Sequence, residues 1–199
     1  HSRQAPVKYN LDFPLEDFTR ADALVRATLL ATGRVDTWNS VRRVTTDVQD
    51  LERVRRHVVT RSLSQTGSVR GITFEAQHNR HEFDMWLNPD AVTEDNSNFR
   101  ATLVHELCHV YLGTSRGHDK VWRRLYARAL FHYHHAVSPI DHHIALVDLN
   151  NWRYTKRAKS ENTAQFLKRI NADREDWIVQ ASHEFEKVNE TWKRMTSRS

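Results

Sequence analysis

The stretch His105-Glu106-Leu107-Cys108-His109 contains two histidines four residues apart, with a glutamate directly after the first. In an α-helix of about 3.6 residues per turn, positions 105 and 109 project from the same face, one turn apart. Two imidazoles placed in this way can ligate one metal ion, and Glu106 then stands beside the open coordination position. The stretch therefore predicts a helix with a catalytic zinc site, in which zinc lowers the pKa of water and Glu106 is the general base.

The residues around this stretch support a helix with a buried face. Its neighbours Val104, Leu107 and Val110 are uncharged, and the flanking segments Asp95 to Asn98 and Leu112-Gly113 are typical of a helix start and a helix end. Cys108 occupies a variable, inward-facing position of the motif. We therefore expect it to be a small buried hydrophobic residue and not a nucleophile.

A third protein ligand is needed to complete such a zinc site, and His118 is the first candidate. Eight residues separate it from His109, which is enough for a short loop to fold back over the ion. Two alternatives remain open. Asp119 could ligate, although it could equally cap the helix expected to follow it, and a distant carboxylate such as Glu161 could also serve.

The pattern of apolar residues predicts an α+β fold. The expected elements are a helix from Pro14 to Gly33, a helix from about Thr46 within an ambiguous segment 41–63, a hairpin of strands 71–77 and 83–87, the helix of the zinc motif, an amphipathic helix from Val121, and a long helix from Asn162. We expect a small, mostly antiparallel sheet packed on the active-site helix, with additional C-terminal helices. The apolar stripe of the last helix favours packing over cofactor binding.

Length and composition limit the organisation of the chain. Its 199 residues predict one compact domain, at 1–145, with a helical extension at 146–199. A single cysteine excludes a disulfide framework and favours a reducing compartment, and no apolar run approaches the length of a membrane span. We therefore expect a cytoplasmic or nucleoid-associated protein. Because the chain begins with His1-Ser2, a removed leader stays open.

The charge of the chain favours a phosphate-bearing partner. The net charge is +5 and the isoelectric point is about 9.6, with arginine far outnumbering lysine. Guanidinium groups pair bidentately with phosphate oxygens, so DNA is the expected partner, although an ordinary solvated face is the alternative. The candidate contacts are Arg42, Arg43, Arg55, Arg56, Arg153 and Arg157. Trp38, Trp152 and Trp177 could stack on bases but are more typical of a core.

Three segments together resemble a known family. They are Met85 to Pro89 at the end of an apolar strand, Thr102 to His109, and Gly117-His118 with an aromatic residue four positions later at Trp122. Over about residues 70–130 the chain resembles the SprT-like zinc metallopeptidases, which include the Spartan proteases. The resemblance implies a zincin-like protease domain, Zn²⁺ bound by His105, His109 and His118, Glu106 as general base, and protein substrates attached to DNA.

The chain lacks two sequence patterns of zinc proteins. Many bacterial relatives end in a cysteine-rich zinc ribbon, which a chain with Cys108 alone cannot form. The short metzincin pattern is excluded because it would need Gly at 112 and His at 115, where the chain has Leu112 and Ser115. The rival functions are a phage- or toxin-type zincin that cleaves one regulatory protein, and a DNA-binding module with a structural or inactive zinc site.

Some features of the sequence leave several possibilities. Tyr111, Tyr126 and Tyr133 are candidates for stabilising an oxyanion, without a basis for choosing among them. A second dense group of potential ligands could hold another metal ion but is more typical of surface histidines. It consists of His132, His134, His135, Asp141, His142 and His143. The oligomeric state is left open.

Overall fold

The computed structural model describes residues 8–9, 15–33, 38–47, 70–77, 79–88, 96–137 and 156–197. The chain divides into two compact units, the first formed by residues 1–19 and 37–117 and the second by residues 20–36 and 118–199. The domain boundary that we predicted at 145/146 lies outside the described residues and stays a prediction.

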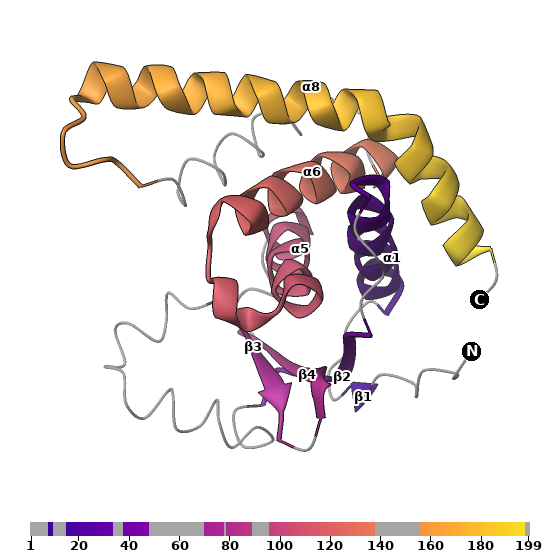
Figure 1. The fold of residues 1–199 in the computed structure, drawn as a ribbon. Coiled ribbons are helices and arrows are strands. Elements are labelled where there is room, and N and C mark those ends of the chain that lie inside the picture. The colour runs from indigo at the N-terminus through magenta and orange to yellow at the C-terminus, as the bar shows by residue number, and fades with distance from the viewer. Residues whose placement is uncertain are drawn as a thin grey trace. The chain divides into compact units, whose positions relative to one another are not determined.

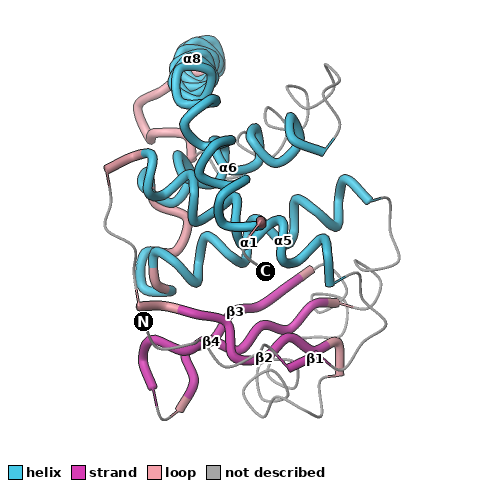
Figure 2. Tube along the Cα trace, turned by 90° about the vertical axis from the view of Figure 1, so that its right-hand side faces the viewer, coloured by secondary structure: helices cyan, strands magenta, loops and turns pink. Residues whose placement is uncertain are grey.

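The first unit contains a four-stranded mixed sheet in the order β1-β2-β4-β3 (Figures 1 and 2). Its strands are β1 (Lys8–Tyr9), β2 (Ser40–Thr45), β3 (Gly71–Ala76) and β4 (Asn79–Leu87). The hairpin of β3 and β4 is the one that the sequence predicts, with β4 beginning earlier than expected. Ile72, Thr73 and Phe74 in β3 and Phe83 and Trp86 in β4 are residues that favour strands, and polar residues lie between the two strands.

The expectation of a mostly antiparallel sheet is wrong. β3 and β4 are antiparallel, but β1 pairs with β2 and β2 pairs with β4 in parallel. A hairpin is visible in the sequence because its strands are adjacent, whereas a parallel pair needs a long crossover connection. Val44 lies opposite Met85, far along the chain, and nothing local encodes that register. The helix predicted from about Thr46 lies outside the described residues, except Thr46 and Asp47, which are not helical.

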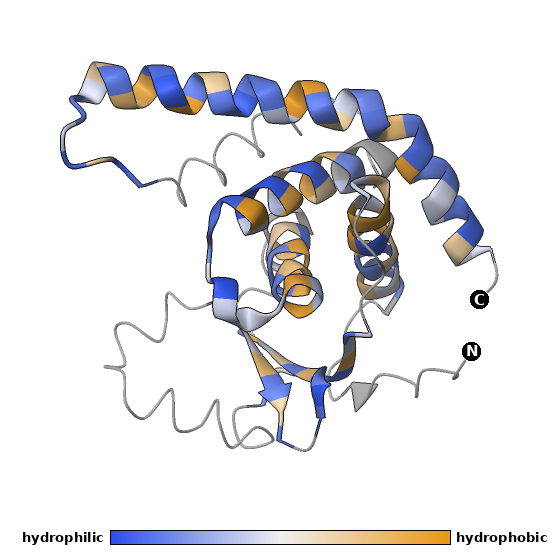
Figure 3. Cartoon of the chain, in the orientation of Figure 1, coloured by the Kyte–Doolittle hydropathy of each residue, from blue (hydrophilic) through white to orange (hydrophobic). Residues whose placement is uncertain are grey.

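Helix α5 (Asn96–Leu112) lies against one face of this sheet and contacts β3 and β2 (Figure 2). The apolar residues between its polar positions, such as Leu103 and Leu107, are fully buried. Figure 3 shows this apolar character along α5. The helix ends as predicted at Gly113, which has a positive φ of 83° that a side chain would strain. The short 3₁₀ helix η1 (Thr114–Arg116) follows.

The described elements of the second unit are helices. They are α1 (Leu15–Ala31), most of which belongs to this unit, α6 (Lys120–Val137) and α8 (Thr163–Thr196). The predicted first and last helices are thus confirmed, and a capping box between Asn162 and Gln165 begins α8. Trp177, Ala181 and Val188 on its apolar stripe are buried, and α8 packs along α6 (Figure 1). No helix in the described part of the chain is long and apolar enough to cross a membrane.

Candidate metal centre

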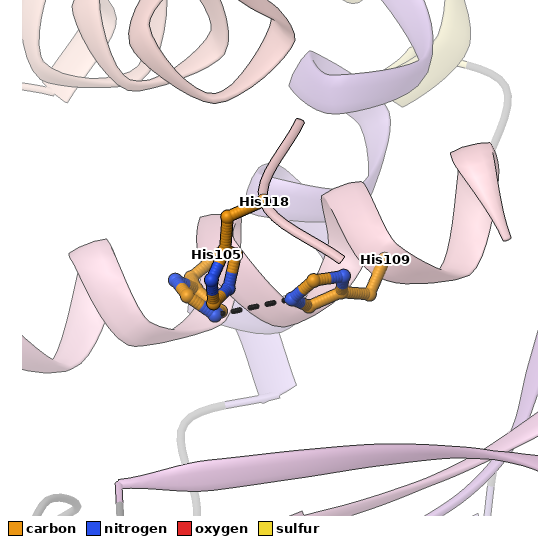
Figure 4. A group of neighbouring side chains, drawn as sticks. All are labelled: His105, His109 and His118. Carbon is orange, nitrogen blue, oxygen red and sulfur yellow. Dashed lines mark hydrogen bonds between the residues drawn. The ribbon is translucent and has the colours of Figure 1, made fainter. Parts of the chain in front are cut away.

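Helix α5 brings His105 and His109 onto one face, as the four-residue spacing predicts. Their Nε2 atoms lie 3.2 Å apart, and their ring centroids are 4.9 Å apart at an angle of 68° (Figure 4). Two nitrogens that bind a tetrahedral zinc at about 2.0–2.1 Å are separated by about 3.3 Å. The two rings therefore already have the spacing of a pair of metal ligands.

His118 is the third histidine of this group. It directly follows Gly117, whose positive φ of 56° turns the chain after η1. Arg123 Nη1 donates a hydrogen bond to the carbonyl oxygen of His118, and the His118 ring lies 4.4 Å from that of Trp122. These contacts give a physical reason for an aromatic residue four positions after the histidine. Trp122 is buried and limits how the imidazole can turn.

The three histidines together can hold a metal ion. Their ligand atoms all lie within 4.8 Å of one another, and Figure 4 shows the three rings gathered at one place. Three neutral imidazoles are a donor set that suits zinc and leaves a coordination position for water. The half-buried rings of His105 and His109 and the exposed ring of His118 leave the group accessible from solvent.

Glu106 lies beside these histidines and is buried. Its Oε1 is 3.8 Å from His105 Nε2, and its side chain is 5% exposed. Thr73 on β3 donates a hydrogen bond of 2.5 Å to Oε2. Burial raises the pKa of Glu106 to about 7, although the Thr73 hydrogen bond opposes that shift. In the metal-free protein, burial therefore favours the protonated form of this carboxyl group.

Two residues of this arrangement escaped the analysis of the sequence, namely Thr73 and Gly71. Both lie on the face of β3 that contacts α5, and a Cβ at Gly71 would lie 2.9 Å from Glu106 Cγ. A glycine inside a predicted strand indicates that another group approaches the backbone closely, so Gly71 could have indicated this contact. The sequence did not indicate which helix would approach it.

The alternative third ligands have other roles in the structure. Asp119 Oδ1 accepts a hydrogen bond of 2.9 Å from the backbone nitrogen of Trp122 and so caps α6. Glu161 is paired with Arg169, with 2.6 Å between Arg169 Nε and Glu161 Oε1. Neither belongs to the group of histidines described above.

Cys108 is fully buried in α5, and burial, together with the nearby charge of Glu106, raises the pKa of its thiol well above the ordinary value. This environment agrees with a packing role.

The three candidate tyrosines, Tyr111, Tyr126 and Tyr133, are all buried. Of the second histidine-rich group, His132 hydrogen-bonds Glu184, while the side chains of the other five members lie outside the described residues.

The arginines that we predicted to contact phosphate differ in their surroundings. Arg42 forms a bidentate pair with Asp84, at 3.0 and 2.6 Å, and Arg157 Nε donates to the carbonyl oxygen of Glu161. Arg43 is half-buried, and Arg55, Arg56 and Arg153 lie outside the described residues. Trp38 is 82% exposed, whereas Trp177 belongs to the core. Trp152 lies outside the described residues.

These observations define an α+β protein with a group of three histidines, two of them on α5, that can hold a metal ion beside a buried carboxyl group. The profile of the SprT-like family matches residues 40–142, more than half of the chain. The chain belongs to the SprT-like family, which confirms the resemblance seen in the sequence. Comparisons with curated proteins and with solved structures return no match.

Proposed function

We propose that this protein is a zinc-dependent endopeptidase that cleaves proteins associated with DNA. The observation that supports it most is the position of Glu106. Its carboxylate oxygen Oε1 stands 3.8 Å from His105 Nε2, next to the three ligands that would bind Zn²⁺. A module with a merely structural zinc site would have no use for a buried carboxyl group at that place, because burying an ionisable group is costly.

The reaction needs a nucleophilic water, a polarised carbonyl group and a proton carrier. His105, His109 and His118 would hold Zn²⁺, which would supply Lewis-acid chemistry by lowering the pKa of water towards neutrality and polarising a peptide carbonyl group. Glu106 accepts the proton of the attacking water on Oε1 and then delivers it to the leaving amine. Its low exposure keeps bulk water away from the carboxyl group, which strengthens these electrostatic interactions.

The position of β3 supports a peptide substrate. Among the described strands, β3 forms one edge of the sheet and its α5-facing side contacts Glu106. An extended polypeptide can add to such an edge through backbone hydrogen bonds, which discriminate little between sequences. We therefore expect cleavage to depend on the flexibility of the substrate. Proteomic mapping of the cut sites should find no sharp consensus, and a strict consensus would contradict this mode of binding.

Replacement of Glu106 by glutamine tests the proposed activity directly. Glu106→Gln should keep the zinc content of the wild type and lower casein or histone digestion by about 10²–10⁴-fold, because a carboxamide cannot carry the proton. The matched control is Glu186→Gln, which removes a carboxylate from an exposed position of α8. If Glu106→Gln digests protein as fast as wild type, the proposed mechanism is wrong.

A further inference from the structure

We infer that Gly71 and Thr73 of β3 form a seat for the Glu106 side chain, and that Thr73 is a positioning residue for proton transfer. This inference rests on the proposed function, because it assigns a role to Thr73 through Glu106. It concerns strand residues that no histidine motif includes. The two residues are separated by one position, so their side-chain positions lie on the same face of the strand.

Thr73 selects one oxygen of the carboxyl group. Its Oγ1 lies 2.5 Å from Glu106 Oε2 and 3.4 Å from the backbone oxygen of Glu106. A hydroxyl group has one proton to donate, and the much shorter distance assigns that proton to Oε2. Oε1 is then the oxygen left facing His105 Nε2, at 3.8 Å. The hydrogen bond thus decides which carboxylate oxygen is available next to the histidines.

Gly71 provides the space that this orientation requires. A Cβ built on Gly71 would lie 2.9 Å from Glu106 Cγ, 3.0 Å from Oε1 and 3.1 Å from Cδ. Three such contacts involve the stem of the side chain as well as its end, so Glu106 could not avoid them by a small rotation. Any residue larger than glycine at position 71 would therefore displace the carboxyl group from its place beside His105.

Together the two strand residues restrict a side chain that is otherwise flexible. A glutamate has several rotatable bonds, and only a few of its rotamers place Oε1 near the histidines. The loss of such positioning lowers the rate of a reaction strongly, since a displacement of about 1 Å can cost about 10²-fold. Loss of the positioning of Glu106 does not alter the three imidazoles. Loss of the seat should therefore change kcat while zinc binding and KM stay nearly constant.

Kinetics of three variants test this role. Thr73→Val, which keeps the shape but removes the donor, should lower kcat by about 10-fold or more, with KM within about twofold of wild type and full zinc content. Thr73→Ser restores the hydroxyl and should recover most of the activity. The matched control is Thr28→Val, which removes a buried hydroxyl that bonds the carbonyl oxygen of Leu24 in α1. This control should keep the wild-type kcat.

Unfolding of the zinc-free protein provides a readout that does not need activity. Thr73→Val should lower the urea midpoint in the wild-type background and change it much less in a Glu106→Ala background, because the partner is then absent. Gly71→Ala should lower both the midpoint and kcat, and the same midpoint loss should be smaller with Glu106→Ala. If Gly71→Ala does not fold, the pair Thr73→Val and Thr73→Ser decides the question alone.

The outcomes separate this inference from the proposed function. Three results would each contradict the inferred role of Thr73 and Gly71. They are a wild-type kcat in Thr73→Val, equal defects in the valine and serine variants, and midpoint changes that are additive with Glu106→Ala. An inactive wild type, or a fully active Glu106→Gln, would instead overturn the endopeptidase proposal and with it the catalytic consequence of the seat. The coupling measured in unfolding would still report whether Thr73 holds Glu106.

Discussion

At the scale of single residues, the burial of Glu106 has an energetic cost that pH should reveal. Its pKa in the folded protein is about 7, against an ordinary value of 4.5, so the folded state favours the protonated form. Stability from this group is fully present below pH 4.5 and is lost as the pH rises through 7. In zinc-free protein, Glu106→Gln should gain about 2–3 kcal/mol over wild type between pH 5 and pH 8, because glutamine cannot ionise.

Urea unfolding of both proteins in the presence of a chelator, at pH 5 and pH 8, measures this gain. A gap of equal size at the two pH values would contradict the raised pKa of Glu106. A gap that widens with pH would mean that the wild type sacrifices stability for an ionisable group at this place, as active sites commonly do.

The grouping of the candidate ligands could be predicted because their spacing expresses helix geometry. His105, Glu106 and His109 need no knowledge of the fold beyond the helix, and His118 followed from the short loop after Gly113. Thr73 could not be predicted in this way. Its role depends on which face of β3 meets α5, and no local pattern near residue 73 states that.

At the scale of elements, α8 is held to α6 by a buried charged group. Glu184 accepts hydrogen bonds from Arg128 in a bidentate pair and lies 3.0 Å from His132 Nε2. All three side chains are at most 15% exposed. Removing one member leaves the others uncompensated, so Glu184→Ala should destabilise the protein by about 2–4 kcal/mol in chemical unfolding. Glu186→Ala, exposed on the same helix, should change stability by less than about 0.5 kcal/mol.

The pH dependence of this loss is also expected. Burial tends to raise the pKa of Glu184, but the hydrogen bonds from His132 and Arg128 outweigh it and lower the pKa below the ordinary 4.5. The stabilisation is therefore present above pH 4.5 and is lost as the pH falls through the lowered value. The difference between wild type and Glu184→Ala should shrink in acid. A difference that stays constant down to pH 3 would show that packing, and not the charge of Glu184, holds α8.

The helices and the hairpin could be predicted because their information is local. Gly33 and Gly113 end helices where a positive φ is needed, and Asn162 caps α8 with its own side chain. The parallel pairing of β1, β2 and β4 could not be predicted. The parallel pairs β1–β2 and β2–β4 join residues that are far apart in the sequence. The sequence of a short strand such as β2 does not indicate whether it pairs in parallel or antiparallel.

At the scale of the whole molecule, the net charge of +5 is the property that supports a DNA partner. Binding that releases counterions from a single strand should weaken steeply with salt. With about four phosphate contacts, the affinity should fall about 50-fold between 50 and 200 mM salt. Single-stranded DNA should also stimulate digestion of a DNA-bound protein, and this stimulation should decline over the same range. A salt-independent digestion rate, unaffected by DNA, would favour a zincin directed at another target.

Two arginine variants test which charges contribute to that salt dependence. Arg42 is committed to Asp84 in a bidentate pair, so Arg42→Gln should lower the unfolding midpoint and leave the salt slope of DNA binding unchanged. The double variant Arg55→Ala/Arg56→Ala should reduce the slope of log affinity against log salt by about 1–2, because each arginine removed loses about one phosphate contact. Fluorescence anisotropy with a labelled oligonucleotide at several salt concentrations measures both slopes. If the Arg42 variant alone flattens the slope, the guanidinium of Arg42 contacts a phosphate, and its pairing with Asp84 does not keep it from DNA.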